Sequence, residues 1–338
     1  MGRKKVTITE VAKEAGVSLA TVSRIFNNKD GEIKISEKTK QKVLKAAAHL
    51  GYQTNPFAAA LRAQKTGIIG ILIRDLKDPF LIELLKEVQQ QVQSRGMDVL
   101  IGHTDYQETT AERQLNVMMN HYHWFDGVIL LDYVAAQNPF LDVLKQYQTP
   151  YVSLTGDGSS ALWPIVHVDD AVGIQLAVAH LTDLGHKNIG FVGKAVSGVE
   201  HRLSLFHQYV PSANAKFVKE DMNNSDELYQ FINELAHHPE PPTALICATD
   251  YIALKVIHCA WQNGLHVPAD LSVIGFDDIT EASEAHIPLT TIRQPMEKMA
   301  EKAVNLLLQQ IQDQQEMDQV QYKMAPVLVE RETTKRMN

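Results

Sequence analysis

Polar side chains stand at several points where predicted strands end, and their types suit the binding of a small polar molecule. Arg202 opens the helix after a predicted 188–192 strand, and Asp277 directly follows a predicted 271–276 strand. A planar guanidinium donates to two hydroxyls or to a carboxylate, and a carboxylate accepts two hydroxyl hydrogen bonds. We therefore expect a site for a hydroxyl-rich ligand, whose other candidate contacts are Asp75, Phe80, Thr249, Asp250 and Gln294.

Four of these positions also have a purely structural interpretation. Arg202 can form an ion pair with a nearby carboxylate. Asp277 can cap a helix, although Asp278 is better placed for that role, and Asp250 is as suitable for a helix cap as for a ligand contact. The ring of Phe80 can stack on a sugar face or fill the core at the start of a helix.

The sequence lacks the arrangements that hydrolases, phosphoryl-transfer enzymes and metalloenzymes require. It shows no Ser-His-Asp order, nucleophile elbow, phosphate-binding loop or metal-ligand spacing. The two cysteines, Cys247 and Cys259, are expected to be free thiols. We therefore expect no enzymatic activity, no cofactor and no metal. Turnover of a bound sugar would revive the enzyme interpretation.

From residue 67 onward, apolar runs alternate with amphipathic segments, which is typical of an α/β body. The run Gly67–Ile73 is continuously apolar and predicts a buried parallel strand. The first series has predicted strands at 67–73, 97–102, 126–131 and 150–154, separated by helices at 79–95, 109–121 and 137–147. A second series begins near Ile165, with strands at 165–168, 188–192, 215–219, 243–248 and 271–276 and helices at 170–184, 200–210, 225–238 and 250–263.

The remaining C-terminal segments are expected to return to these two series. A helix at 296–314 is predicted to join the first lobe, and residues 327–329 are predicted to form a last strand. Two doubly wound lobes place the carboxyl ends of their strands around one cleft, where ligands bind. This places the polar positions described above around a shared site.

The N-terminal part differs from the body in charge. Residues 1–65 carry 13 Lys and Arg against 5 Asp and Glu, whereas the remaining residues carry 19 against 35. A basic head on an acidic body indicates that the head meets a polyanion. A solvated, lysine-rich helical surface is the alternative, and the local pattern of the head decides between them.

That pattern predicts a helix-turn-helix. Thr7 and Glu10 form a capping box, Gly16 suits a sharp turn, and Ser18 caps a second helix that ends at Phe26. A third helix runs from a Ser36 cap to about Leu50 and is closed by Gly51. Its inward-facing residues are expected to be Val43, Leu44 and Ala47.

In such a motif the second helix enters the major groove, and its first residues reach base edges. Leu19 and Ala20 can make only apolar contacts, such as with a thymine methyl, whereas Arg24 can reach a guanine or a phosphate. The alternative for Leu19 is a helix-packing role. The other predicted contacts, which position the phosphate backbone, are Thr7, Ser18, Thr21, Ser23 and Asn27.

The run from Val6 to Asn27 resembles the head of the lactose/galactose repressor family of bacterial transcriptional regulators. The resemblance continues through residues 51–56 and implies a hinge helix within residues 56–62, which is too short to be stable alone. It also implies that Leu61 wedges into the minor groove and that Asn55 and Ala58 face the DNA. The alternative is a helical linker with Leu61 packed on the body. The 27–35 loop is longer than is usual in the family.

Three strings in the body carry the same resemblance, at residues 184–191, 272–278 and 288–294. It implies a body of two doubly wound parallel-sheet lobes like those of periplasmic binding proteins. The expected domains are a helix-turn-helix at 1–53, a hinge at 54–66, an N-terminal lobe of 67–162 plus 294–325, and a C-terminal lobe of 163–293 plus 326–332.

The function implied is that of a cytoplasmic homodimeric repressor that binds pseudo-palindromic operator DNA and is released by a small sugar. A corepressor-dependent regulator that responds to a nucleobase or a phosphorylated metabolite is the alternative. A solute-binding protein would require export, and the N-terminus lacks the apolar core of a secretory signal. Such a protein would also have no use for a basic helix-turn-helix.

Overall fold

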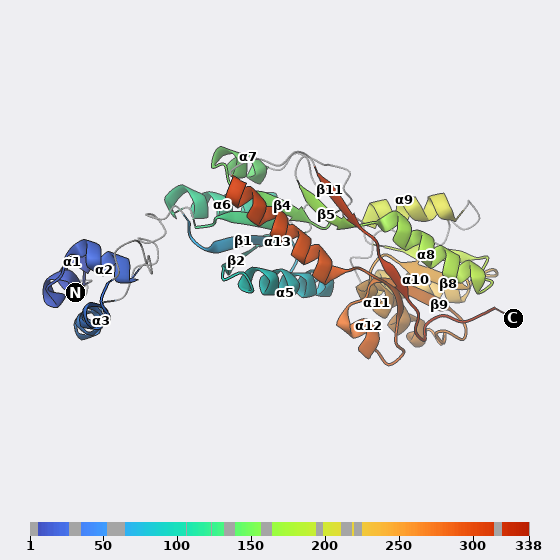
Figure 1. Cartoon of the computed structure of the whole chain (residues 1–338). Coiled ribbons are helices and arrows are strands. Elements are labelled where there is room, and N and C mark those ends of the chain that lie inside the picture. The colour runs from blue at the N-terminus through green and yellow to red at the C-terminus, as the bar shows by residue number, and fades with distance from the viewer. Residues whose placement is uncertain are drawn as a thin grey trace. The chain divides into compact units, whose positions relative to one another are not determined.

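The computed structural model describes most of the chain. The described residues are 6–26, 35–52, 65–105, 107–122, 124–131, 139–156, 164–193, 199–210, 218–219, 225–313 and 320–337. The chain divides into two compact units, residues 1–67 and 68–338. Their helices and strands are labelled in Figure 1.

The first unit contains three short helices, α1 (Ile8–Ala15), α2 (Leu19–Phe26) and α3 (Glu37–Leu50). Thr7 and Glu10 form the expected capping box, and Ser36 caps α3. Gly16 and Gly51 end α1 and α3 in the left-handed conformation, with φ of 59° and 66°, which glycine adopts without strain. These local signals therefore fix the ends of the helices as the sequence predicted.

One inward-facing residue of α3 was predicted wrongly. Leu44 is 45% exposed, whereas Val43, Ala46 and Ala47 are buried in the small core of this unit. Residues 43, 46 and 47 follow the i, i+3, i+4 spacing that places side chains on one helix face. Leu44 lies about 100° around the helix from Val43, so it faces away from that core.

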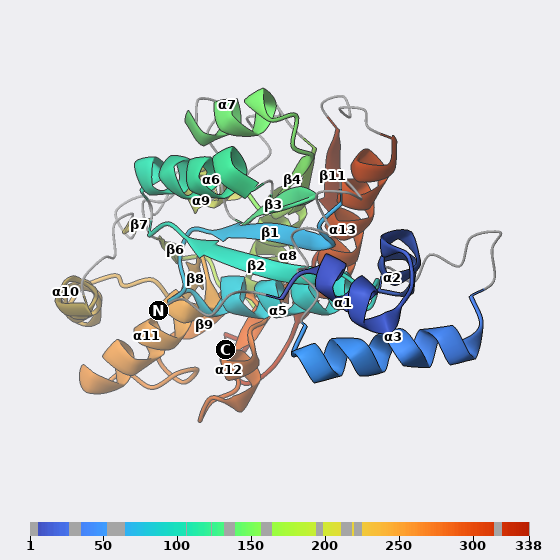
Figure 2. The same ribbon diagram turned by 90° about the vertical axis from the view of Figure 1, so that its left-hand side faces the viewer.

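The second unit contains two six-stranded sheets. The first has the order β2-β1-β3-β4-β5-β11, and its pairs are all parallel. Figure 2 shows this sheet with α6 and α7 on one side and α5 on the other. Its elements are β1 (Ile68–Ile73), α5 (Pro79–Gln93), β2 (Asp98–His103), α6 (Glu108–Tyr122), β3 (Gly127–Leu131), α7 (Pro139–Gln146), β4 (Tyr151–Leu154), β5 (Ile165–Val168) and β11 (Gln321–Met324).

The second sheet has the order β7-β6-β8-β9-β10-β12, in which β12 is the antiparallel edge strand. Helices connect its strands. Its elements are α8 (Asp170–Asp183), β6 (Ile189–Val192), α9 (Val199–Tyr209), β7 (Val218–Lys219), α10 (Ser225–Ala236), β8 (Ala244–Cys247), α11 (Asp250–Gln262), β9 (Ser272–Asp277), α12 (Thr280–Glu284), β10 (Thr290–Arg293) and β12 (Val327–Val329).

Strand β5 lies in a different sheet from the one the sequence predicted. The predicted boundary at residue 163 assigned Ile165–Val168 to the second lobe, but β5 pairs with β4 and with β11 in the first sheet. The periodicity of a short apolar run does not specify its partner. The first lobe therefore extends through Val168, and the chain enters the second lobe at α8.

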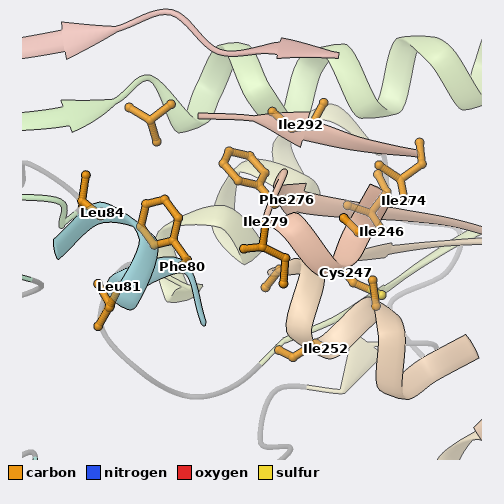
Figure 3. Packing of buried hydrophobic residues seen from close by; sticks show 14 of the residues in the cluster. Phe80, Leu81, Leu84, Ile246, Cys247, Ile252, Ile274, Phe276, Ile279 and Ile292 are labelled. Atoms are coloured by element: carbon orange, nitrogen blue, oxygen red, sulfur yellow. The ribbon is translucent and has the colours of Figure 1, made fainter. Parts of the chain in front are cut away.

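The chain passes between the two sheets at three places: from β5 to α8, from β10 to α13 (Met296–Asp313), and from β11 to β12. Helix α13 packs against α5, β3 and β4 of the first lobe. Buried residues of both lobes form one continuous cluster, to which Phe80 of α5 and Phe276 of β9 both belong (Figure 3). Phe276 of this cluster contacts the side chain of Arg202, one of the polar positions at the strand ends.

Candidate functional site

Helix α2 presents an apolar side chain to solvent at its first turn. The Ser18 hydroxyl accepts a hydrogen bond from the Thr21 amide at 3.1 Å and so caps the helix. Leu19 is 49% exposed, whereas Val22 one turn later is buried in the core of the unit. The exposure of Leu19 argues against the helix-packing alternative and leaves its side chain available for contact with a partner.

The other predicted DNA contacts in the described part of the head lie on α2, at its cap, or at the cap of α1. The Thr21 hydroxyl is hydrogen-bonded to the Ser18 hydroxyl at 2.8 Å, and the Thr7 hydroxyl takes part in the capping box of α1. Ala20 and Arg24 are exposed, and Ser23 is half-buried. Four further predicted contacts lie outside the described residues: Asn27, Asn55, Ala58 and Leu61.

In the body, Arg202 of α9 is held from several sides. Its Nε donates to the Asp170 carboxylate at 2.7 Å and its Nη1 donates to the Ala248 carbonyl at 2.6 Å. The guanidinium carbon stands 3.7 Å from the centre of the Phe276 ring, a cation–π contact. Arg202 is only 9% exposed. The ion pair that the sequence allowed is therefore present, and it fixes the orientation of the guanidinium.

Asp277 lies at the end of β9 beside this guanidinium. Its Oδ1 accepts a hydrogen bond from the Gln294 side-chain amide at 2.7 Å and lies 3.7 Å from Nη1 of Arg202. Burial raises the pKa of Asp277 well above its ordinary value, and the nearby positive charge of Arg202 partly opposes this rise. The backbone φ of Asp277 is 127°, a conformation that L-residues rarely adopt.

The alternative helix-cap roles are not those that the sequence suggested. Asp278 does not cap α12; its carboxylate binds Arg293 at 2.5 Å and Arg331 at 2.6 Å. The residue at the cap position is Ile279, which makes no side-chain cap hydrogen bond. The ion pairs instead tie the end of β9 to β10 and to the chain after β12, so Asp278 holds the strands that position Asp277.

Thr249 and Asp250 also differ from expectation. The Thr249 hydroxyl caps α11 through the Ile252 amide at 3.3 Å, so Thr249 and not Asp250 is the cap. Asp250 is 0% exposed, and its carboxylate accepts hydrogen bonds from the Ile279 amide at 3.0 Å and from the Thr291 hydroxyl at 2.5 Å. Asp250 therefore holds α11, α12 and β10 together beneath the site, and its position favours this role over a ligand contact.

On the first lobe, the predicted positions Asp75 and Phe80 flank Asp78, which was not predicted from the sequence as a site residue. Asp78 caps α5 by accepting hydrogen bonds from the Phe80 and Leu81 amides at 2.9 and 3.4 Å. Phe80 is 7% exposed and belongs to the buried cluster, which favours the core role over sugar stacking. The Asp75 carboxylate accepts a hydrogen bond from the Lys77 amide at 2.8 Å.

Charged groups from both lobes act on one another at this place. Burial raises the pKa of Asp78. The negative charge of Asp75 raises this pKa further, whereas the positive charge of Arg202 lowers it. The charge of Asp78 in turn raises the pKa of Asp277 in the second lobe. Asp78 and Asp170 are the two residues of this site that were not predicted from the sequence, and both stand at the start of a helix. Asp78 directly precedes a proline, a common helix start, and Asp170 follows the cap residue Asp169. The helix-start signal could have identified them.

The comparisons with known proteins cover nearly the whole chain. Residues 7–55 match the family described as bacterial regulatory proteins, lacI family, and residues 178–334 match a periplasmic binding protein-like domain. The HTH-type transcriptional regulator DegA of Bacillus subtilis is 32% identical over 308 residues, which cover 87% of this chain and 88% of DegA. This protein belongs to the lacI family of bacterial regulatory proteins. The HTH-type transcriptional repressor CytR of Escherichia coli (strain K12) is 31% identical over 91% of this chain and 90% of CytR.

The same architecture occurs in a solved complex. The Lac repressor dimer bound to operator and the anti-inducer ONPF matches with a TM-score of 0.85 and 26% identity, covering 98% of this chain and 100% of the repressor chain. This lacI-family protein is thus a DNA-binding transcriptional regulator with an effector-binding body, and its relatives are regulators and not enzymes. In the part of the chain that the structure describes, no helix is both long and apolar enough to cross a membrane.

Proposed function

We propose that this regulator represses carbohydrate-utilisation genes and that a small sugar bound between the two lobes releases it from its operator. Arg202, Asp277 and Gln294 form the second-lobe part of the proposed effector site, and Asp75 and Asp78 form the first-lobe part. The observation that carries this proposal is the fixed set of donors and acceptors around Arg202 and Asp277.

The charge of the site favours a neutral ligand over an anionic one. Three carboxylates, those of Asp78, Asp170 and Asp277, act on the guanidinium of Arg202. A phosphate placed here would compete with the Asp170 carboxylate for the Arg202 guanidinium in a largely buried environment, where repulsion between anions is poorly screened. Sugar hydroxyls both donate and accept hydrogen bonds, and therefore complement carboxylates and a guanidinium together. A phosphorylated effector is disfavoured on this ground, and a nucleobase is the competing neutral ligand.

The DNA-binding part of the proposal rests on the exposed first turn of α2. We propose that Leu19 and Ala20 contact base edges in the major groove and that Arg24 contacts a guanine or a phosphate. Residues 54–66 are proposed to form the hinge, with Leu61 as the minor-groove wedge. Effector binding and operator binding are then reciprocal: a sugar that weakens DNA binding binds less tightly to the DNA complex.

The proposal includes a homodimer that acts on a pseudo-palindromic operator in the cytoplasm. Three apolar side chains of the first lobe are exposed: Ile82 on α5 is 39% exposed, Ile101 on the edge strand β2 is 42% exposed and Val117 on α6 is 58% exposed. Ile82 and Val117 lie on helices on opposite sides of the first sheet, so these three residues do not form one patch, and the dimer is proposed from the likeness to the Lac repressor dimer. Sedimentation equilibrium of the purified chain measures the association state, and a monomer at micromolar concentration would contradict the dimer.

The decisive experiment measures operator binding with and without candidate effectors. Fluorescence anisotropy with a cognate operator duplex is repeated in the presence of D-glucose, D-galactose, D-ribose, cellobiose, their phosphorylated forms, and purine and pyrimidine bases. Release by an unmodified sugar supports the proposal. Tighter binding caused by a nucleobase favours the corepressor alternative, and an unchanged affinity throughout the panel would refute effector control by these classes.

A further inference from the structure

The first lobe holds a second group of buried polar atoms that the proposed contacts do not use. Thr155 directly follows β4, and His167 lies in the neighbouring strand β5. Leu154 is paired with Val166, and the Thr155 amide donates to the Val166 carbonyl at 2.9 Å. Thr155 and His167 are therefore neighbours on adjacent strands.

Both side chains are more than nine-tenths buried, yet their polar atoms lack well-formed hydrogen bonds. Thr155 is 8% exposed and His167 is 3% exposed. Within the described structure, the hydroxyl of Thr155 and both ring nitrogens of His167 make no hydrogen bond of good geometry, and the His167 ring has only a weak interaction with the Val168 backbone. Most buried polar groups in folded proteins are hydrogen-bonded, since leaving one unpaired costs free energy. Three such atoms without a well-formed hydrogen bond at neighbouring positions therefore indicate a place prepared for a polar ligand.

The backbone supports the same interpretation. The φ of Thr155 is 73°, in the left-handed region, and Thr is β-branched, so this conformation is strained. Such strain is retained where a side chain must be held in one direction. Because Val166 and Val168 belong to the large cluster shared by the two lobes, and Ile165 to the separate cluster beside α6 and α7, His167 faces the α6–α7 side of the sheet.

This place is electrostatically connected to the proposed effector site. The carboxylate of Asp170 binds Arg202, and its negative charge also raises the pKa of the His167 ring. Burial lowers the pKa of His167; the carboxylates of Asp169 and Asp170 oppose this effect and Lys323 of the neighbouring strand adds to it. The ring is therefore neutral near pH 7, with one nitrogen as a donor and the other as an acceptor.

We propose that Thr155 and His167 form a first-lobe subsite that binds the hydroxyl groups of the sugar effector and contributes to its specificity. The subsite offers two groups that each donate and accept, which matches a pair of neighbouring sugar hydroxyls. This inference rests on the proposed function, because it assigns a second part of the same site to the same class of ligand.

The test is isothermal titration calorimetry of the full chain with D-glucose, D-galactose, D-ribose and cellobiose, in which the tightest binder becomes the probe. His167→Leu and Thr155→Val are expected to weaken binding of the probe about tenfold or more. His167→Gln and Thr155→Ser, which keep hydrogen-bonding groups, are expected to restore part of the affinity.

The structure supplies a matched control in Thr149. This threonine is 6% exposed, its hydroxyl also lacks a partner among the described residues, and it precedes β4 at the opposite end of the same strand. Thr149→Val is expected to change the affinity for the probe by no more than about twofold. A loss in Thr149→Val equal to that in Thr155→Val would overturn the subsite, because it would show a general effect on the lobe.

Thermal melting of the unliganded proteins separates a ligand-binding role from a structural one. If the subsite serves the ligand, His167→Leu and Thr155→Val leave the unliganded Tm unchanged or raise it, and they reduce the rise that the probe causes. A lower unliganded Tm with unchanged probe affinity would show that the two residues serve folding, for example through buried water, and would overturn the subsite.

The outcomes also distinguish this inference from the proposed function. Wild-type binding of a sugar together with unchanged affinity in all four variants would overturn the subsite alone. Absence of binding by the wild type to all four sugars would overturn the subsite together with the proposal of a sugar effector from this panel.

Discussion

Nη1 of Arg202 lies 3.7 Å from Oδ1 of Asp277, close enough for charge attraction but beyond hydrogen-bonding distance. The same guanidinium donates shorter hydrogen bonds to Asp170 and to the Ala248 carbonyl. Asp277 is therefore held beside a positive charge without a direct hydrogen bond from it. We propose that one hydroxyl of the bound sugar accepts a hydrogen bond from the guanidinium and donates one to Asp277.

Removal of Arg202 is expected to affect both ligand binding and stability. Arg202→Ala leaves the carboxylates of Asp170 and Asp277 buried without their counter-ion, so the free energy of unfolding of the body should fall by about 3–5 kcal/mol. Urea denaturation followed by circular dichroism measures this loss. Operator affinity in the absence of sugar is expected to persist, because the head is a separate compact unit.

A double variant separates the two roles of Arg202. Arg202→Ala combined with Asp277→Asn removes one uncompensated charge, so part of the lost stability should return while sugar binding stays absent. If the double variant regained sugar binding as well, Arg202 would have only a structural role.

Leu19 is expected to contribute to operator recognition and not to folding. Because its side chain is 49% exposed, Leu19→Ala should leave the stability of the head unchanged, while loss of one apolar base contact should weaken specific operator binding about tenfold. Anisotropy titrations at fixed salt with operator and random duplexes measure the difference. Leu44→Ala is the matched control, since Leu44 is a 45% exposed leucine on α3. Equal losses on the two duplexes would argue against base reading.

The stability of the body should depend on pH through Asp250. Burial raises the pKa of this carboxyl from 3.8 to about 6, so the folded state binds more protons than the unfolded state between these values. The free energy of unfolding should therefore fall as the pH rises from about 4 to about 6. Asp250→Asn is expected to flatten this dependence while lowering stability overall through lost hydrogen bonds. An unchanged slope would show that other groups cause it.

The capping box of α1 should protect the start of the head. Thr7→Ala removes a side-chain cap and is expected to cost about 1 kcal/mol of local stability, which accelerates amide exchange in α1 about fivefold. Hydrogen exchange followed by mass spectrometry on the full chain measures this rate. Thr9→Ala provides the control, since Thr9 is exposed within the helix and makes no cap. Equal acceleration in both variants would contradict the capping role.

Many features of this protein could be predicted from the sequence because their causes are local. The Thr7–Glu10 box, the left-handed Gly16 and the Ser36 cap depend on residues a few positions apart, and the structure confirms each of them. The long apolar runs predicted most of the strands of both sheets for the same reason. Short elements without a periodic pattern, such as α12 and β11, were missed; β11 is a half-exposed edge strand whose pairing with β5 defines it.

The sequence by itself determined the order of the helices and strands, the basic head and the positions where polar residues end the strands. The tertiary structure decided the sheet to which β5 belongs, the burial of Asp250, and the partners of Arg202 and Asp277. The physical reason is that strand pairing, desolvation and ion pairing join residues tens of positions apart, as between Arg202 and Asp170. Local propensities carry no information about such pairs.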